Sequence, residues 1–292
     1  MSRDAIGLFD LPSAAYHADQ VAEVPTLSKS IIHTLLTQSP AHAWQQHPKL
    51  NPAFARTDEA KFDVGTIAHQ ILLEGHADTL VIVHEPDWRK KHAQETRDQA
   101  REDGLTPLLA HQAEEVEAMV AAIRSQLHTH QATPELFTEG TAEKTLVWDE
   151  NGVACRARLD WLRDDLAACD DLKTTSRSAN PDGWTRSTLY SIAADVQAAF
   201  YMRGLRAVTG RDIPFRFCVV ETNPPYALSV IELGADVLEL ANTKIDWSLK
   251  VWQGCLEAND WPAYPARVAT AELPGWELAR WMEREAREEV AA

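Results

Sequence analysis

Cysteine is scarce in this sequence, and long apolar runs are absent. Its 292 residues include four cysteines, at Cys155, Cys169, Cys218 and Cys255, and no two of them form a C-x-x-C pair. A disulfide framework is not expected in such a chain, and a four-cysteine zinc or iron–sulfur site normally includes a closely spaced pair. We therefore expect buried, reduced thiols. Because no run of about 18 apolar residues occurs, no transmembrane helix is expected either.

Basic residues are outnumbered by acidic ones. The chain has 28 lysines and arginines against 44 aspartates and glutamates, a formal net charge of −16 at pH 7. Passive nucleic-acid binders depend on basic patches that neutralise phosphates, so the composition argues against that class. It leaves open an enzyme with a local basic channel, or one whose acids gather a divalent metal ion. The first twenty residues carry Asp4 and Asp10 and lack a continuous apolar core, so we expect a cytoplasmic protein without a signal peptide.

Hydrophobic periodicity and turn residues predict one α/β domain over residues 1–292. Residues 1–130 are expected to form a mainly helical N-terminal portion, 140–258 the core, and 259–292 a tail with a charged helix. The expected helices span 28–36, 59–74, 87–103, 106–127, 193–208 and 236–256, and a short strand spans 80–83. A central mixed, largely antiparallel sheet flanked by helices is expected from strands at 145–148, 153–162, 166–172, 215–221 and 227–233.

The stretch DDLKTT at 170–175 places acids and a lysine where a strand would alternate apolar residues. If this strand pairs with 153–162 through a tight turn at Asp164 and Asp165, the residue opposite Asp160 is Cys169. The position of each side chain then follows from the register and from the side-chain period of two.

In that register Asp160, Asp171 and Lys173 share one face of the sheet, with Arg158 opposite Asp171. Asp160 and Asp171 are then diagonal neighbours, and Asp170 points to the other face. Two converging carboxylates repel each other unless a cation lies between them, and hard oxygen ligands suit Mg²⁺ or Mn²⁺. A divalent ion beside a lysine is suited to phosphodiester hydrolysis. The alternative is that these residues form the polar face of an edge strand.

Several blocks, in order, resemble the PD-(D/E)xK nuclease superfamily, in particular its RecE-type exonuclease VIII branch found in prophages. They are LSKS at 27–30, SPAH at 39–42, FDVGTIAH at 62–69, RARLDWL at 156–162, DLKTT at 171–175, VQAAFY at 196–201 and WPAY at 261–264. The blocks span nearly the whole chain, and their order makes the match specific although each is weak alone. Leu159 replaces the proline of the family name. The resemblance implies a restriction-endonuclease-like core.

The resemblance also implies a metal site. Asp160, Asp171 and the backbone carbonyl of Leu172 would bind the ion, and Lys173 would be the catalytic lysine. His69 matches a histidine that RecB-like members add to the metal shell. In the expected helix 59–74, His69 lies beside an apolar stripe that includes Phe62 and Ile67, so it also fits a helix-face histidine with a structural partner.

Three further residues match the same branch. Gln197 and Tyr201 fit a Q-x-x-x-Y element and lie on one face of a helix, where they would contact the scissile phosphate and the DNA, although they also fit ordinary helix packing. Glu143 resembles an auxiliary acid of λ-exonuclease-like enzymes and would hold a metal or make a surface bond. Thr174 and Thr175 are candidates for contacts to DNA phosphates, and β-branched residues also favour strands.

A DNA enzyme with this net charge needs its basic residues gathered locally. One candidate group is the charged segment with Arg89, Lys90 and Lys91, continued by Arg97 and Arg101. The second follows the Q-x-x-x-Y helix and comprises Arg203, Arg206 and Arg211. Each group also fits a solvated helix face, which is the usual meaning of a charge run.

The resulting hypothesis is a Mg²⁺-dependent (or Mn²⁺-dependent) exonuclease acting on linear double-stranded DNA. It would degrade one strand 5′→3′ and leave a 3′ single strand for recombination with a single-strand annealing partner. The resemblance implies a homo-oligomeric ring, a tetramer or trimer, and no iron–sulfur cluster. Two alternatives remain: a restriction or repair endonuclease of the same superfamily, and an inactive module that binds DNA or protein.

Overall fold

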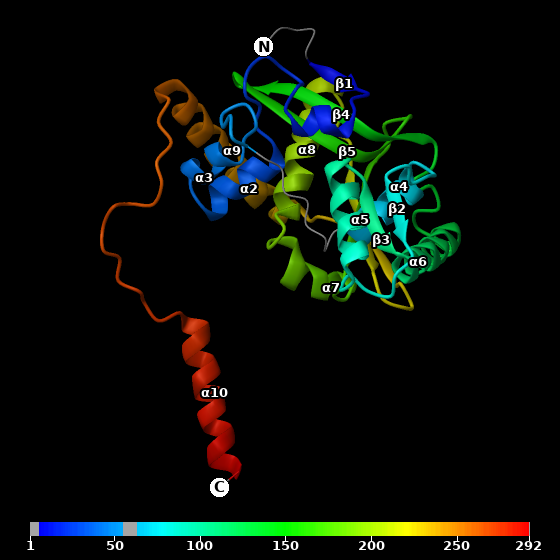
Figure 1. Cartoon of the computed structure of the whole chain (residues 1–292). Coiled ribbons are helices and arrows are strands. Elements are labelled where there is room, and N and C mark those ends of the chain that lie inside the picture. Colours follow the sequence, from blue (N-terminus) through cyan, green and yellow to red (C-terminus); the bar gives the residue numbers. More distant parts are fainter. Residues whose placement is uncertain (1–5, 55–62, 292) are drawn as a thin grey trace. The chain divides into compact units, whose positions relative to one another are not determined.

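The computed structural model describes residues 6–54 and 63–291. The chain divides into two compact units, Met1–Pro262 and Ala263–Ala292. The first unit holds a six-stranded sheet with helices on both faces, and the second is built around one helix (Figure 1). No helix in the described part of the chain has the length and apolar composition needed to cross a membrane.

The central sheet has the strand order β1-β4-β5-β6-β7-β8. Its strands are β1 (Gly7–Phe9), β4 (Gly140–Glu150), β5 (Val153–Arg163), β6 (Cys169–Thr175), β7 (Phe215–Glu221) and β8 (Leu228–Glu232). All neighbours are antiparallel except β6 and β7, which run parallel. The predicted mixed, largely antiparallel sheet is therefore confirmed. Strand β1 was not predicted, because three residues are too few to show a periodic pattern.

Helices cover both faces of this sheet. Those of the first unit are α1 (Ser13–His17), α2 (Lys29–Thr37), α3 (Pro40–Gln45), α4 (Asp63–Leu73), α5 (Lys91–Glu102), α6 (Ala110–Thr129), α7 (Pro181–Trp184), α8 (Ala194–Thr209) and α9 (Ala235–Ala258). A single π-helical turn, η3 (Thr185–Leu189), follows α7. Apolar residues of α2, α8 and α9 pack on one face of the sheet, and those of α4 and α6 pack on the other.

A very close helix–sheet contact in the main core is made at Gly204 of α8. A Cβ atom at this position would lie 2.8 Å from side-chain atoms of both Leu146 and Trp148. Only glycine allows α8 to lie this close to β4 without displacing the buried tryptophan. This contact fixes the height of α8 above the sheet, and α8 is the helix that carries Gln197.

Two expectations about the N-terminal portion change. Residues 106–109 were expected to begin a helix, but they form strand β3 (Thr106–Leu109), parallel to β2 (Leu80–Val83). Pro107 is tolerated there because each strand of a two-stranded sheet is an edge strand, and a proline can leave its missing donor on the open side. The helix proper, α6, begins after it. The start of the expected helix 59–74, with Phe62, lies outside the described residues.

The second unit consists of α10 (Gly275–Ala291) and the segment before it. It exposes several large apolar side chains, namely Tyr264, Val268, Leu273, Trp276, Leu278, Trp281 and Met282. Trp261, just before this unit, instead packs edge-on against Trp252 of α9, with ring centroids 5.2 Å apart.

Candidate metal centre

Two neighbouring antiparallel strands, β5 and β6, supply the central carboxylates. Trp161 pairs with Asp170 and Leu162 with Cys169, and these two pairs make up the β5–β6 ladder. The expected pairing of Asp160 with Cys169 is therefore wrong. Just beyond the ladder the Leu172 N–H donates to Asp160 Oδ2 (2.9 Å), and the two carboxylates lie close enough for the charge of Asp160 to raise the pKa of Asp171.

The register differs because the β5–β6 turn is longer than expected. The Leu166 N–H donates to the Arg163 carbonyl (3.0 Å), and Asp165 accepts from the Ala167 N–H (2.9 Å) and from the Arg163 guanidinium. These bonds stabilise a loop two residues longer than a tight turn. Because side chains alternate with period two, a shift of two residues keeps each side chain on its predicted face.

His69 on α4 bridges two acids. Its Nε2 lies 2.9 Å from Asp160 Oδ2, and its Nδ1 lies 3.3 Å from Glu143 Oε1. Burial alone would lower the pKa of His69, but the Asp160 and Glu143 carboxylates raise it to about 9. Within the described part of the chain, these three residues form a group whose potential ligand atoms all lie within 4.8 Å of one another.

A glycine one turn before His69 allows α4 to approach the sheet. A Cβ atom on Gly65 would lie 2.8 Å from Thr174 Oγ1 of β6. Since real Cβ atoms do not approach an oxygen this closely, any larger residue would require α4 or the Thr174 side chain to move. Gly65 and Thr174 thus set the distance at which His69 meets Asp160.

Glu143 has a left-handed backbone conformation, with φ of 59°. It lies opposite Asp160 in the β4–β5 ladder, between the pairs Ala142–Trp161 and Lys144–Leu159, and the ladder is interrupted at this point. A non-glycine residue at positive φ inside a strand is uncommon and is typical of functional sites. The carboxylate also accepts a hydrogen bond from Arg158 Nε. Burial raises the pKa of Glu143, and the nearby Asp160 adds to this effect.

Asp171 is fully buried and is held by two side chains. Lys173 Nζ donates to its Oδ2, and Gln197 Nε2 of α8 donates to its Oδ1 at 2.5 Å. Burial and the charge of Asp160 raise the pKa of Asp171 to about 6. Burial would lower the pKa of Lys173, but Asp171 and Asp160 outweigh burial and raise it. The lysine is therefore a charged partner for two crowded carboxylates.

The donor set fits a hard divalent cation. Oxygen atoms of Asp160 and Glu143 and a nitrogen of His69 converge from three different elements, β5, β4 and α4. Asp171 of β6 lies close enough for the charge of Asp160, together with burial, to raise its pKa, and a bound cation would relieve this repulsion. The predicted residues are thus brought together by the fold, while the role of each, including the Leu172 carbonyl, stays a prediction.

Tyr201 lies beside this centre but is buried. Its ring packs edge-on against Phe215, with centroids 5.7 Å apart, and burial raises the pKa of its hydroxyl well above the ordinary value. Tyr201 also lines a pocket of about 300 Å³ next to Asp160 and Glu143. The predicted shared face of Gln197 and Tyr201 therefore points toward the centre and this pocket.

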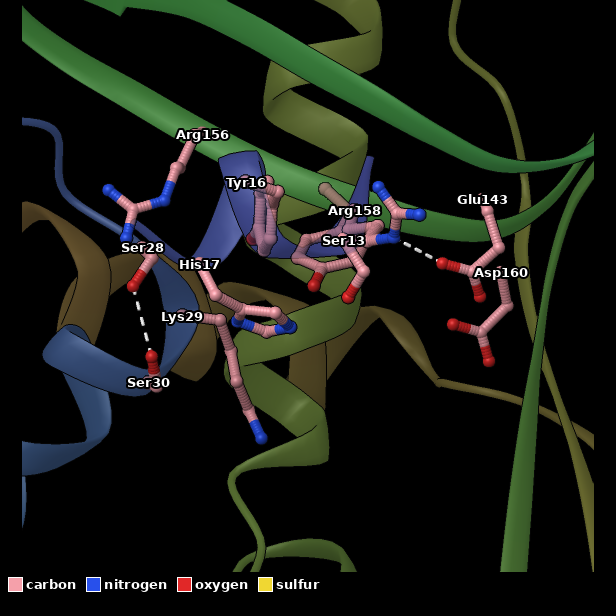
Figure 2. Close-up of a pocket in the computed structure, with 11 residues that line it drawn as sticks. Ser13, Tyr16, His17, Ser28, Lys29, Ser30, Glu143, Arg156, Arg158 and Asp160 are labelled. Atoms are coloured by element: carbon pink, nitrogen blue, oxygen red, sulfur yellow. Dashed lines mark hydrogen bonds and ion pairs between the residues drawn. The ribbon is translucent and has the colours of Figure 1, made fainter. Parts of the chain in front are cut away.

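The pocket also contains residues of α1 that sequence patterns did not single out (Figure 2). Its other lining residues are Ser13, Tyr16, His17, Ser28, Lys29, Ser30, Arg156 and Arg158. Arg156 is buried; its Nη1 lies 2.5 Å from Asp19 Oδ1, while its Nε has no hydrogen-bond partner among the described residues. The signals available in the sequence were the block LSKS at 27–30 and the alternating arginines of the block at 156–162. The short helix α1 gave none.

The candidate DNA-contacting residues are mostly paired with acids. Arg203 contacts both Glu150 and Asp246 at 2.7 Å. The other pairs are Arg89–Asp87, Lys90–Glu85, Lys91–Glu95, Arg97–Asp98, Arg101–Asp63 and Arg206–Asp212. Thr175 Oγ1 accepts from the backbone N–H of Arg177. A DNA contact by any of these residues remains a prediction.

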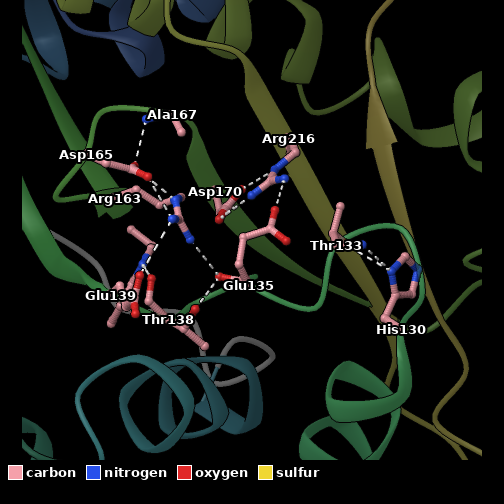
Figure 3. A network of polar contacts seen from close by, with 11 residues as sticks. His130, Thr133, Glu135, Thr138, Glu139, Arg163, Asp165, Ala167, Asp170 and Arg216 are labelled. Atoms are coloured by element: carbon pink, nitrogen blue, oxygen red, sulfur yellow. Dashed lines mark hydrogen bonds and ion pairs between the residues drawn. The ribbon is translucent and has the colours of Figure 1, made fainter.

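Asp170 points to the opposite face of the sheet, as expected. Arg216 of β7 donates to the Asp170 carboxylate from Nε (2.6 Å) and Nη2 (3.0 Å), and from Nη1 to Glu135 (Figure 3). Both Asp170 and Arg216 are buried. The two adjacent aspartates therefore have different partners: Asp170 joins β6 to β7, and Asp171 is held by Lys173 and Gln197.

Comparison with known proteins agrees with this fold. Residues 28–273 match the family model described as a PDDEXK-like domain of unknown function (DUF3799). A solved candidate exonuclease from Eubacterium rectale is similar in structure, with a TM-score of 0.58 and 14% identity over 92% of this chain and 98% of that one. A second solved protein, SSO0001, shows a TM-score of 0.24 and 13% identity over 66% of this chain and 88% of its own. No curated protein matches.

Proposed function

Because the chain belongs to the family of PDDEXK-like domains, which matches residues 28–273, we propose that it is a metal-dependent deoxyribonuclease. One observation carries the proposal: His69, Glu143 and Asp160 converge within 4.8 Å, directly beside the Asp171–Lys173 pair. A cluster of hard ligands next to a lysine is suited to stabilising the charge that develops during phosphodiester hydrolysis.

Asp160, Asp171 and His69 would hold the ion, with the Leu172 carbonyl and Glu143 as further ligands. When bound, Mg²⁺ or Mn²⁺ would polarise a phosphate oxygen and lower the pKa of a coordinated water. A histidine binds a metal only through an unprotonated ring nitrogen. In the metal-free protein the His69 ring instead bridges the two acids, so it must lose a proton to become a ligand.

Lys173 would act on the phosphate and on the attacking water. Its ammonium group is held by Asp171 and lies 5.7 Å from the centre of the Phe217 ring, so it is aimed at the carboxylates rather than free in solvent. Gln197 fixes Asp171 from the other side. These contacts orient the lysine and the carboxylate before substrate arrives, and pre-organised groups lose little free energy on binding.

The pocket beside the centre favours exonuclease activity. Lys29, Arg156 and Arg158 line it together with hydroxyl groups of Ser28 and Ser30. Cations and hydroxyls gathered in a pocket suit a strand end, with its phosphate, better than a continuous duplex. We therefore propose that linear double-stranded DNA is degraded from its ends, 5′→3′, leaving a 3′ single strand for a strand-annealing partner. A homo-oligomeric ring around the duplex is part of the same proposal.

A test of this function uses end-labelled linear duplex and covalently closed circular duplex of the same sequence. With Mg²⁺, the wild-type protein should release nucleotides from the linear DNA only. The Lys173→Ala variant and a wild-type sample in EDTA should release none. Cutting of the closed circle would indicate the endonuclease instead, and equal activity of the Lys173→Ala variant would disprove the assigned chemistry.

A further inference from the structure

The connection between β6 and α8, residues 176–192, lies beside the candidate centre without belonging to it. It begins three residues after Lys173 and ends just before Ala193, whose left-handed backbone (φ 51°) starts α8. It contains α7 and the π-helical turn η3 (Figure 1). Single π-helical turns are rare and are found frequently at functional sites.

Buried side chains hold the inner side of this segment. Trp184 and Leu189 are completely buried, and the Trp184 ring lies 5.5 Å from that of Phe217. Phe217 is also the ring beneath the Lys173 ammonium group. The backbone N–H of Ala179 donates to Glu221 at 2.8 Å. The segment is therefore packed on the same aromatic residue that contacts the catalytic lysine.

The far end of the segment is tied to the pocket. Lys29, which lines the pocket, donates from Nζ to the carbonyl of Ile192 at 2.6 Å. Lys244 forms a 2.5 Å ion pair with the buried Asp195, two residues before Gln197. The end of the segment is thus tied to the pocket and to the start of the helix that carries Gln197.

The outward side carries two arginines and one aromatic ring. Arg177 is exposed and forms no ion pair with any acid in residues 6–54 and 63–291; its Nη1 reaches only a carbonyl, 3.5 Å away. Arg186 faces Asp182 at 4.0 Å, and such an exposed pair contributes little. Tyr190 is 47% exposed, with Lys244 Nζ 5.1 Å from the centre of its ring. The segment thus carries two arginines against one acid, Asp182, in a chain of net charge −16.

Building on the proposed function, we propose that this segment binds the unpaired DNA strand next to the centre. Arg177 and Arg186 would neutralise two of its phosphates, and Tyr190 would stack on one of its bases. A cationic surface with an exposed aromatic ring is the arrangement that binds single strands, since the bases of an intact duplex are already stacked on one another. An unpaired strand is bound through both the cations and the aromatic ring, whereas a duplex is bound through the cations alone.

The test compares DNA binding by the full chain in EDTA, so that no strand is cut. Fluorescence anisotropy is measured with a labelled duplex bearing a single-stranded tail, in 5′-tail and 3′-tail versions, and with a blunt duplex. Tyr190→Ala should weaken binding to a tailed duplex at least about 5-fold, while Tyr190→Phe, which keeps the ring, should bind like the wild type. Blunt duplex should bind equally to all three. Trp247→Ala, which removes a similarly exposed ring from α9, is the control.

The arginines are tested through the salt dependence of the same binding. Arg177→Ala with Arg186→Ala should reduce the slope of log affinity against log salt by about 1.5, because each phosphate contact contributes about 0.7 to 0.9. Arg280→Ala removes an arginine of similar exposure that faces Glu277 and belongs to neither candidate DNA-contacting group, and it should leave the slope unchanged. If these variants bind and degrade DNA like the wild type, the segment is not a binding surface, although the nuclease function stands. If the wild type neither binds nor degrades DNA, both proposals fail.

Discussion

Gly65→Ala tests the contact that positions His69. The new methyl group would lie 2.8 Å from Thr174 Oγ1, so α4 or Thr174 must move by more than half an ångström to reach ordinary van der Waals distance. Overpacking of this kind costs about 1–3 kcal/mol, partly offset by the roughly 1 kcal/mol by which alanine favours a helix over glycine.

Gly254→Ala is the matched control, because Gly254 also lies in a helix and its Cβ would meet no atom of the described residues within 4 Å. It should stabilise the protein by up to about 1 kcal/mol, whereas Gly65→Ala should destabilise it by up to about 2 kcal/mol. Urea unfolding gives both values. Gly65→Ala should also weaken Mn²⁺ binding, measured by calorimetry, since His69 is moved away from Asp160.

Thr174→Ala removes the atom that the new methyl group meets. In this background Gly65→Ala should regain most of the lost stability and metal affinity, because the next nearest atom, Thr174 Cβ, lies 3.9 Å from the place that the methyl group would take. The reasoning is refuted if Gly65→Ala stabilises the protein as much as Gly254→Ala does and leaves Mn²⁺ affinity unchanged.

Three further outcomes are expected. Asp170→Ala should destabilise the fold by about 3 kcal/mol in urea unfolding, since it leaves the buried Arg216 without its main partner, whereas Asp165→Ala at the exposed turn should cost less than about 1 kcal/mol. Folding raises the pKa of His69 from 6.5 to about 9 in the metal-free protein, so its stabilisation is complete below pH 6.5 and is lost as the pH rises to 9. In EDTA the unfolding free energy should fall by at most about 3 kcal/mol over this pH range. His69→Gln should abolish this pH dependence. Gln197→Ala should lower Mn²⁺ affinity or turnover about 10- to 100-fold while leaving the melting temperature nearly unchanged; an unaltered enzyme would show that the bond to Asp171 has no role.

The closeness of Asp160, Asp171 and Lys173 was predictable because they lie on neighbouring strands of one antiparallel pair. The turn between the strands was misjudged by two residues, yet an even shift leaves every side chain on its face. The order of the sheet was predictable only in part, since the parallel pairing of β6 with β7 depends on the long connection that contains α8.

Other parts of the site depend on contacts between distant segments. Glu143 meets Asp160 and His69 because its own backbone is left-handed inside β4. Nothing in the sequence of this strand signals that conformation. Arg156 and Tyr16 enter the pocket because α1, only five residues long, lies against β5, and so short a helix has no readable period. Likewise, the acidic partners of Arg203 lie 53 and 43 residues away from it.

The most direct measurement is the position of bound Mn²⁺ in crystals, located by its anomalous scattering. A single strong peak among the side chains of His69, Asp160 and Asp171 is predicted, and Asp160→Asn should remove or greatly weaken it. A peak elsewhere, or none in crystals grown at millimolar Mn²⁺ and a pH at which His69 is neutral, would contradict the metal centre on which the proposed nuclease rests.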